Sequence, residues 1–138
     1  MFLNGITVLV AGGCGLIGYE LVFQILDCGA NVIVGDCNQD FRLIDNLLAT
    51  KSCYAQLDIA NTGSIDQAFA VNVKQFGSVN AFVNALIVNP EFESQTKEML
   101  TSGTDNPVGK MVTEQDIADA VNFLCSEKAN MIRGQTIV

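Results

Sequence analysis

Short apolar runs alternate with longer segments of mixed polarity along most of the chain. The runs are rich in β-branched side chains and have the length of strands buried on both faces, at residues 6–10, 31–35, 53–57 and 79–83. The segments between them have the length and apolar spacing of helices, at residues 16–28, at 41–49, and from a cap at Thr62 or Ser64 to Gly77. The regular alternation predicts β-α-β units rather than internal repeats.

The start and apolar face of the third helix are predicted from its side chains. Thr62 or Ser64 is positioned to cap it, and Ser64 with Gln67 has the spacing of a capping box. The apolar face is expected to consist of Ile65, Phe69, Val73 and Phe76, and the helix to end at Gly77.

The pattern fails after Pro90 and returns near the end of the chain. Residues 88–112 are polar and carry glycine and proline, which predicts an irregular segment. Thr113 and Asp116 resemble a capping box. The helix that follows is amphipathic, with Ile117, Ala120, Val121 and Leu124 at i, i+3, i+4 and i+7. The final residues, GQTIV at 134–138, are predicted to form a fifth strand.

These elements predict an α/β protein with a parallel sheet and helices on both faces. At 138 residues the chain has the length of one domain, which we assign to residues 1–138. The fold class is therefore a three-layer, doubly wound parallel sheet of about five strands.

Composition and charge exclude several classes of function. The net charge is −8 and no basic cluster is present, which argues against nucleic acid or an anionic membrane as a partner. No apolar stretch reaches the ~20 residues that a membrane span needs, and the first apolar run lacks a basic leader, so we expect a cytoplasmic location. The chain has no histidine, and its five cysteines form no C-x-x-C pair. We therefore expect no metal site, no Ser–His–Asp apparatus, and reduced cysteines.

A glycine cluster interrupts the first apolar run, in the stretch GITVLVAGGCGLIGYE. Both Gly13-x-Gly15-x-x-Gly18 and Gly12-x-x-Gly15-x-x-Gly18 satisfy a dinucleotide fingerprint between a predicted strand and a predicted helix. Such a loop lets the backbone and the helix amides approach a pyrophosphate. The alternative interpretation is a tight strand-to-helix turn that binds nothing.

Asp36 is the second candidate for dinucleotide binding. It follows the second predicted strand, 18 residues after Gly18, close to the usual offset of about 20 residues. A carboxylate there accepts hydrogen bonds from the adenosine ribose hydroxyls and repels a 2′-phosphate. Its neighbours Gly35, Cys37 and Asn38 include no arginine, so NAD(H) is favoured over NADP(H).

Several motifs together resemble the short-chain dehydrogenase/reductase family. TVLVAGGCGLIG is similar to its first strand and glycine loop, with Ala11 where threonine is usual. LDIANTGSID is similar to the turn after its third strand, and AFVNALIVNP to its LVNNAG strand. The most specific match is PVGKMVTEQDIADAVNFLCSEKANMIRGQTIV, which is similar to the family's C-terminal segment.

The resemblance implies a reduced NAD(P)-binding Rossmann fold and a set of cofactor residues. Asp58 and Ile59 would lie against the adenine, and Asn84 matches the first asparagine of the fourth-strand motif, with Ala85 after it. The complete implied set is Gly12, Gly13, Cys14, Gly15, Leu16, Ile17, Gly18, Asp36, Cys37, Asp58, Ile59, Asn84 and Ala85.

The family's catalytic segment is missing from the sequence. The family carries a Tyr-x-x-x-Lys motif, whereas Tyr19 is followed four residues later by Phe23, and Tyr54 by Asp58. Only 28 residues, 85–112, separate Asn84 from Thr113, too few for the strands and helices that the family places there. No catalytic residue is therefore assigned, and residues 88–112 replace the catalytic half.

Without the missing strands, the sheet has two predicted completions. The last strand docks beside the fourth after a right-handed crossover through a helix at 114–126, which gives the order 3-2-1-4-5. Alternatively, the exposed edge of the fourth strand pairs with a second copy and forms a homodimer.

Three functional interpretations follow. The first is a truncated, oxidoreductase-like protein that binds NAD(H) without the family's standard catalysis. The second is an active NAD-dependent oxidoreductase that uses a partner subunit or substituted residues such as Glu91, Glu93 or Lys97. The third is a fold remnant that binds no dinucleotide and has a structural or interaction role.

Overall fold

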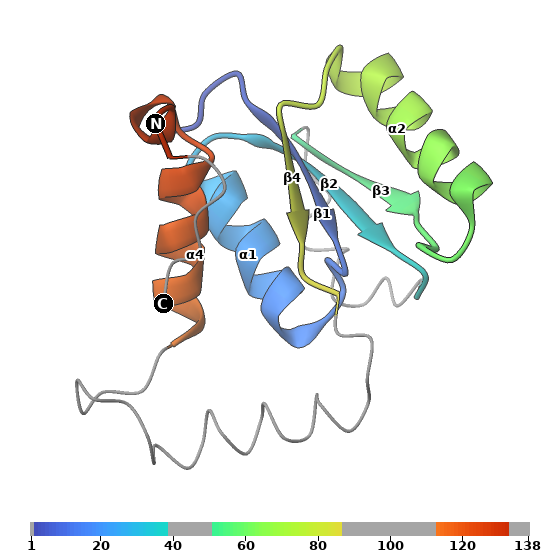
Figure 1. Ribbon diagram of the computed structural model, residues 1–138, viewed down its shortest axis with the longest axis horizontal. Helices are drawn as coiled ribbons and strands as arrows, with labels where there is room; N and C mark the ends of the chain where they lie inside the picture. The colour runs from blue at the N-terminus through green and yellow to red at the C-terminus, as the bar shows by residue number, and fades with distance from the viewer. Residues whose placement is uncertain (1, 39–50, 87–112, 133–138) are drawn as a thin grey trace.

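Four parallel strands form the centre of the molecule in the order β3-β2-β1-β4 (Figure 1). The computed structural model describes residues 2–38, 51–86 and 113–132. The strands are β1 (Thr7–Ala11), β2 (Asn31–Asp36), β3 (Ser52–Gln56) and β4 (Ala81–Asn84). The helices are α1 (Leu16–Asp27), α2 (Thr62–Phe76) and α4 (Glu114–Leu124), followed by the short 3-10 helix η2 (Glu127–Ala129).

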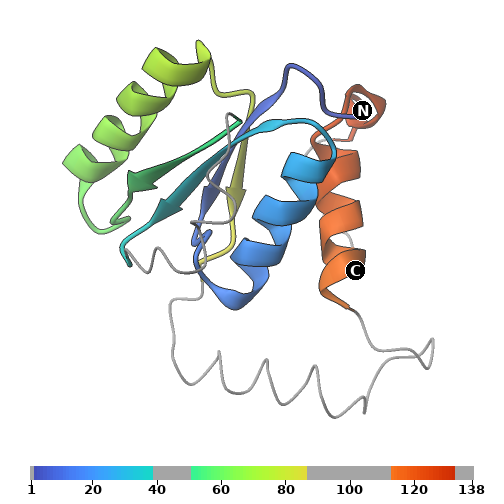
Figure 2. The same ribbon diagram turned by 180° about the vertical axis from the view of Figure 1, so that it is seen from behind.

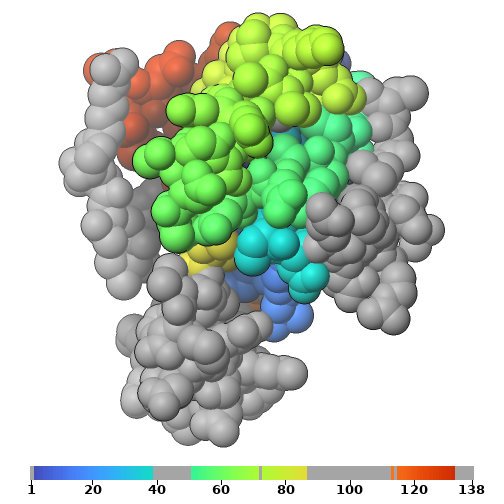
Figure 3. Space-filling view, turned by 90° about the vertical axis from the view of Figure 1, so that its right-hand side faces the viewer, coloured from blue at the N-terminus to red at the C-terminus, as the bar shows by residue number. Residues whose placement is uncertain are grey.

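Helices cover both faces of this sheet. Helices α1 and α4 lie side by side on one face and α2 on the other (Figures 1 and 2). Figure 3 shows α2 lying over β3 on its side of the molecule. The predicted α/β class, with a doubly wound parallel sheet in three layers, is confirmed.

Alternation along the inner strands builds a separate apolar cluster on each face. Val8 and Val10 of β1 pack with Val22 of α1, whereas Leu9 and Ala11 pack on the face that α2 covers. All these residues are at most 1 % exposed. Burial on both faces explains why β1 and β2 are continuous apolar runs in the sequence.

The predicted element boundaries are correct to within one or two residues. Gly29 (φ +93°) and Gly77 (φ +82°) end α1 and α2 in the left-handed region, as their positions in the sequence predicted. The predicted helix at 41–49, the irregular segment at 88–112 and the strand at 134–138 lie outside the described residues.

The predicted cap of α2 was wrong, and its predicted apolar face is correct in part, because Ile65 and Phe76 pack against the core. Asn61 caps the helix, because its Oδ1 accepts hydrogen bonds from the amides of Gly63 and Ser64. Ala68, which is 2 % exposed, faces the sheet, whereas Phe69 and Val73 are 37 % and 53 % exposed. The small Ala68 side chain allows close approach to the sheet, so the buried stripe runs through Ala68 and leaves Phe69 and Val73 toward solvent.

The start of α4 follows the prediction and its buried face follows it in part. The side chain of Thr113 accepts from the Asp116 amide at 3.2 Å, and Asp116 Oδ2 accepts from the Thr113 amide at 2.8 Å, which completes the capping box. Ala118 is fully buried beside α1, whereas Ala120 and Leu124 of the predicted face are exposed.

The face of the sheet on which α4 lies argues against the predicted right-handed crossover, whose last strand lies outside the described residues. Strand β2 and any strand outside β4 lie on opposite sides of β1. The connection from β1 to β2 and a connection from β4 to an outer strand therefore run in opposite directions across the sheet. If both had the same hand, their helices would lie on opposite faces of the sheet. Helix α4 shares the face of α1, so a connection from β4 through α4 to an outer strand would be left-handed rather than right-handed.

Candidate functional site

The predicted cofactor residues gather where the four strands end. Parallel strands direct their carboxyl ends to the same edge of a sheet, which is where open α/β sheets bind ligands. The glycine loop follows β1 and Asp36 ends β2. Asp58 and Ile59 follow β3, and Asn84 ends β4. The structure therefore brings the sequence-predicted set to a single edge.

The turn after β1 is built from backbone hydrogen bonds and one left-handed glycine. The amides of Gly12 and Gly13 donate to the carbonyl of Gly35 at 2.8 and 3.2 Å. Gly12 has φ +78°, and a Cβ placed on it would lie 2.9 Å from the carbonyl oxygen of Ala85. Ala85 therefore closes the back of the turn.

Close packing explains two further glycines without any ligand. A Cβ on Gly13 would lie 2.7 Å from Cγ1 of Val34, and one on Gly18 would collide with the carbonyl of Gly12. Gly15 differs, because it is exposed and a Cβ placed on it would meet only the Gly12 carbonyl, at 3.3 Å. Gly15 is thus the position where an absent side chain leaves the helix N-terminus open to solvent.

The N-terminus of α1 carries no side-chain cap. Its N-cap is Gly15, and its first turn contains no acidic residue. Helices α2 and α4, in contrast, begin with side-chain caps from Asn61 and Thr113. The first amides of α1, at Leu16 and Ile17, are therefore available to an anion, which the helix dipole favours.

Asp36 is joined directly to the glycine loop. The residue is 8 % exposed. Its Oδ2 accepts from the Cys14 amide at 2.9 Å, and its Oδ1 accepts from the Asn38 amide at 2.9 Å. Each carboxylate oxygen can accept a second hydrogen bond. The acid and the loop therefore form one rigid unit with acceptor capacity left over.

Tyr54 supports this unit, which the sequence alone did not predict. Its hydroxyl donates to the carbonyl oxygen of Asp36 at 2.7 Å. Burial, and then the nearby Cys14, Asp36 and Cys37, raises the pKa of Tyr54 to about 12. Val34 of β2 pairs with Tyr54 of β3, which places Tyr54 in the strand next to Asp36. This register could have identified the role of Tyr54, but it is visible only in three dimensions.

The turn after β3 is held by its own hydrogen bonds. Asp58 Oδ1 accepts from the Ala60 amide at 2.9 Å, and the Asp58 amide donates to Ser64 Oγ at 2.9 Å. Ile59 projects outward and is 49 % exposed. An exposed apolar side chain beside a fixed turn offers a surface on which a planar ring can stack.

The end of β4 lies directly behind the glycine loop. The Ala85 amide donates to the Ala11 carbonyl at 2.9 Å, and Asn84 Oδ1 accepts from the Leu86 amide at 3.1 Å. The exposed Asn84 side chain therefore has its oxygen in a local turn and its amide group toward solvent.

The cysteines and the other possible metal ligands limit the chemistry that the described residues can support. All five cysteines are free thiols; Cys37 is exposed, and burial raises the pKa of Cys53 and Cys125. Within residues 2–38, 51–86 and 113–132, no three His, Cys, Asp or Glu side chains gather as a metal site. In the same ranges, no helix has the length and apolarity to cross a membrane.

The fold and the loop at the strand ends define a Rossmann-type α/β protein. A sequence model described as short chain dehydrogenase matches residues 6–106, so the chain belongs to the short-chain dehydrogenase family.

Solved structures show the same fold. A short-chain dehydrogenase/reductase, described as a glucose/ribitol dehydrogenase, from Brucella melitensis matches with a TM-score of 0.78 and 13 % identity, over 99 % of this chain and 95 % of that one. A hydroxysteroid dehydrogenase from Escherichia coli matches with a TM-score of 0.73 and 16 % identity, over 96 % and 94 %. A 3-ketoacyl-(acyl-carrier-protein) reductase from Brucella melitensis, complexed with NADH, matches with a TM-score of 0.71 and 16 % identity, over 94 % of each chain.

Proposed function

We propose that the protein binds NAD(H) at the carboxyl ends of β1, β2 and β3, without the family's standard catalysis. The observation that carries this proposal is the 2.9 Å hydrogen bond from the Cys14 amide to Asp36 Oδ2. It holds a ribose-binding carboxylate at a fixed position beside an uncapped helix N-terminus. The uncapped helix N-terminus is not needed to explain the packing of the loop, and Asp36 keeps acceptor positions beyond those that hold the loop.

The residues present fit the two halves of an adenosine diphosphate group. The amides of Leu16 and Ile17, behind the exposed Gly15, would hold the pyrophosphate. The free acceptor positions of Asp36 would bind the ribose hydroxyls, and Ile59 would lie against the adenine. A 2′-phosphate beside Asp36 would meet a negative charge, which supports NAD(H) over NADP(H). When bound, the nicotinamide supplies hydride-transfer chemistry.

The tyrosines of this chain do not provide the family's acid/base group. Neither Tyr19 nor Tyr54 has a lysine four residues later. The Tyr54 hydroxyl is engaged with the Asp36 carbonyl, and its pKa of about 12 holds it protonated near neutral pH. Tyr54 is therefore a positioning residue for Asp36, and the proposal assigns no catalytic residue.

A fold remnant that binds no dinucleotide is the second candidate, and one specific observation favours it. Internal packing alone accounts for the glycines at 12, 13 and 18. These three positions would therefore persist in a domain that had lost its ligand. Gly15 and Asp36 are the positions that distinguish an NAD(H)-binding protein from a fold remnant that binds no dinucleotide.

Saturation-transfer NMR with NADH and NADPH tests the proposal. We expect transfer to the adenine and ribose protons of NADH, and weaker transfer to NADPH. A dehydrogenase assay against alcohols and sugar nucleotides is expected to show no turnover. Saturation transfer to neither dinucleotide would leave the remnant interpretation, and clear turnover would show that other residues replace the missing tyrosine and lysine.

A further inference from the structure

The two sides of the proposed dinucleotide site are unequal in the described structure. The adenosine diphosphate side has three groups, which are the uncapped amides at the start of α1, the Asp36 carboxylate and the exposed Ile59 side chain. They lie at the ends of β1, β2 and β3. On the other side of β1 the next strand is β4, so the second nucleoside of a dinucleotide would extend over the end of β4.

The end of β4 uses its polar groups for local structure. Asn84 Oδ1 accepts from the Leu86 amide at 3.1 Å, and the Ala85 amide donates to the Ala11 carbonyl at 2.9 Å. The carbonyl oxygen of Ala85 packs against Gly12, 2.9 Å from the position of a Cβ. Asn84 therefore offers a ligand its Nδ2 group as a donor, and neither Asn84 nor Ala85 offers a charge.

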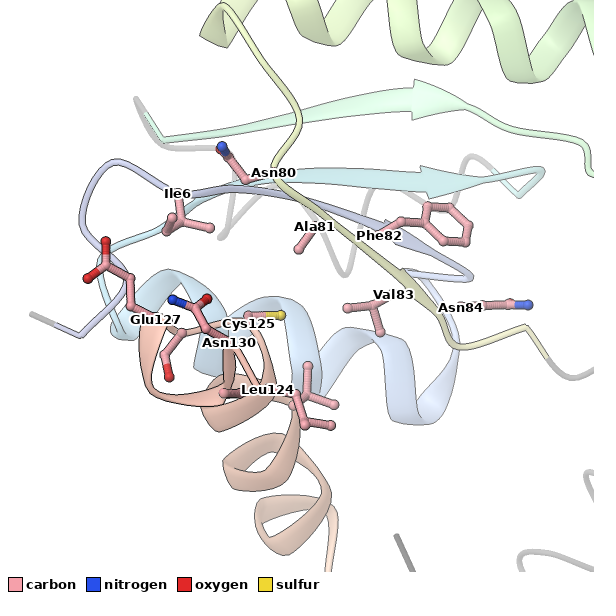
Figure 4. Close-up of a pocket in the computed structure, with 13 residues that line it drawn as sticks. Ile6, Asn80, Ala81, Phe82, Val83, Asn84, Leu124, Cys125, Glu127 and Asn130 are labelled. Atoms are coloured by element: carbon pink, nitrogen blue, oxygen red, sulfur yellow. The ribbon is translucent and has the colours of Figure 1, made fainter. Parts of the chain in front are cut away.

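The hollow beside β4 does not extend this side of the site. It holds about 640 Å³ and lies between β4 and the corner where α4 is followed by η2 (Figure 4). Its lining continues from Asn84 back to Asn80, which precedes β4, and to Glu127. Figure 4 shows Val83 pointing from β4 toward Leu124 across this hollow. The hollow therefore runs along the edge of the sheet, toward the amino end of β4 and away from the glycine loop.

The described cations lie away from the carboxyl ends of the strands. Lys51 precedes β3, and its Nζ donates to the Gly29 carbonyl at 3.0 Å. Lys74 lies in the last turn of α2, and Lys128 lies over the Phe2 ring at 4.9 Å. In the part of the chain that the structure describes, a pyrophosphate at the glycine loop would therefore be held by the helix N-terminus without a cationic side chain.

Such a site favours a diphosphate ligand of low charge. A terminal phosphate loses its second proton with a pKa of about 6, so ADP carries about one more negative charge at pH 7 than ADP-ribose, whose two phosphates are both esterified. The chain itself has a net charge of −8, and Asp36 lies beside the glycine loop. Electrostatic repulsion therefore disfavours a free terminal phosphate.

We propose that the site recognises the adenosine diphosphate half of its ligand, and binds adenosine 5′-diphosphates that carry a free 2′-hydroxyl and a sugar on the second phosphate. NAD(H) is one member of this class, and ADP-ribose, which lacks only the nicotinamide, is another. The oxidation state of the nicotinamide has little effect on affinity. This ligand class rests on the proposed NAD(H)-binding function and widens it.

Calorimetric titration of the full chain with a ligand series tests the proposal. We expect NADH, NAD⁺ and ADP-ribose to bind with dissociation constants within about 3-fold of one another. AMP lacks the second phosphate and is expected to bind about 10-fold to 100-fold more weakly, the range for lost hydrogen bonds to a charged group. ADP is expected to bind about 3-fold more weakly than ADP-ribose at low salt, with a difference that shrinks as salt screens its extra charge.

Two variants locate the side of the site that supplies the affinity. Asp36→Asn is expected to weaken NADH and ADP-ribose by the same factor, because both ligands present the same adenosine ribose to the carboxylate. Asn84→Ala is the comparison at the end of β4, and is expected to leave the ratio of the two affinities unchanged, because NADH differs from ADP-ribose only in the nicotinamide.

Four outcomes would overturn the proposal. NADH that binds 10-fold or more tightly than ADP-ribose would show that the nicotinamide is recognised, and would leave the NAD(H) function in place. Loss of NADH affinity alone in Asn84→Ala would show the same. AMP that binds as tightly as ADP-ribose would show that the second phosphate is not held. Absence of binding for every ligand in the series would overturn this proposal and the NAD(H) function together.

Discussion

The backbone amide of Cys14 donates a hydrogen bond of 2.9 Å to the Oδ2 atom of Asp36, across 22 positions of sequence. This contact joins the end of β2 to the loop that follows β1. Because Tyr54 donates to the Asp36 carbonyl from β3, three neighbouring strands contribute to the position of one carboxylate. The proposed preference for NAD(H) depends on that position.

Replacing the carboxylate tests its role in dinucleotide binding. Asp36→Asn removes the charge and leaves one acceptor oxygen, so we expect NADH affinity to fall by about 10-fold to 100-fold, the range for a hydrogen bond to a charged group. NADPH affinity is expected to change less, because repulsion of its 2′-phosphate is also removed. Calorimetric titration measures both.

The control for this substitution is Asp66→Asn, which removes one negative charge from an exposed position on α2. An equal loss of NADH affinity in both variants would assign the effect to net charge and contradict a local role for Asp36.

Two glycine substitutions separate packing from ligand binding. Gly18→Ala places a Cβ against the Gly12 carbonyl, so we expect a loss of about 2–4 kcal/mol in unfolding free energy. Gly15→Ala meets only a 3.3 Å contact and is expected to fold with nearly unchanged stability, while weakening NADH binding. Chemical denaturation and calorimetry on both variants check this. Unchanged NADH binding in Gly15→Ala would show that the pyrophosphate does not approach this position.

The raised pKa of Tyr54 predicts a stability change in alkali. The pKa of about 12 in the folded chain exceeds the usual tyrosine value near 10, so folding favours the protonated hydroxyl. The stabilisation is fully present below pH about 10 and is lost as the pH rises toward about 12. Tyr54→Phe removes this part of the pH dependence and, near neutral pH, costs about 1 kcal/mol for the lost hydrogen bond.

Denaturation as a function of pH measures this effect, with Tyr19→Phe as the comparison. If Tyr54→Phe leaves the alkaline stability profile unchanged, the Tyr54 hydroxyl is not held by Asp36 in solution.

Asn122 marks a site where the sequence is not optimal for stability. It is 6 % exposed on α4, and its Oδ1 has no hydrogen-bond partner in the part of the chain that the structure describes. Because an unpaired buried acceptor is costly, we expect Asn122→Leu to raise the free energy of unfolding by about 1 kcal/mol. A fall in the thermal midpoint of Asn122→Leu would show that the amide is satisfied in solution.

The cap of α2 is the opposite case. Asn61→Ala removes this cap and is expected to lower the free energy of unfolding by about 1 kcal/mol.

Local sequence signals predicted the strands and most helix ends. Gly29 and Gly77 adopt the left-handed backbone that their positions suggested, and Thr113 with Asp116 forms the predicted capping box. These features depend on neighbours within a few residues. The order of β3, β2, β1 and β4 followed from the resemblance to the family.

Features that depend on three-dimensional packing were not predicted. The periodicity of α2 could not show that the sheet would take the small Ala68 rather than Phe69. The pattern of α4 gave an amphipathic helix but not the face of the sheet that it covers. The role of Tyr54 required the register between β2 and β3, which no local signal provides.

Calorimetric titration of the unmodified chain with NADH and NADPH, each raised to about 1 mM, tests the central claim most directly. We expect saturable binding of NADH that is tighter than that of NADPH. Absence of binding to either dinucleotide in this range, or tighter binding of NADPH, would contradict it.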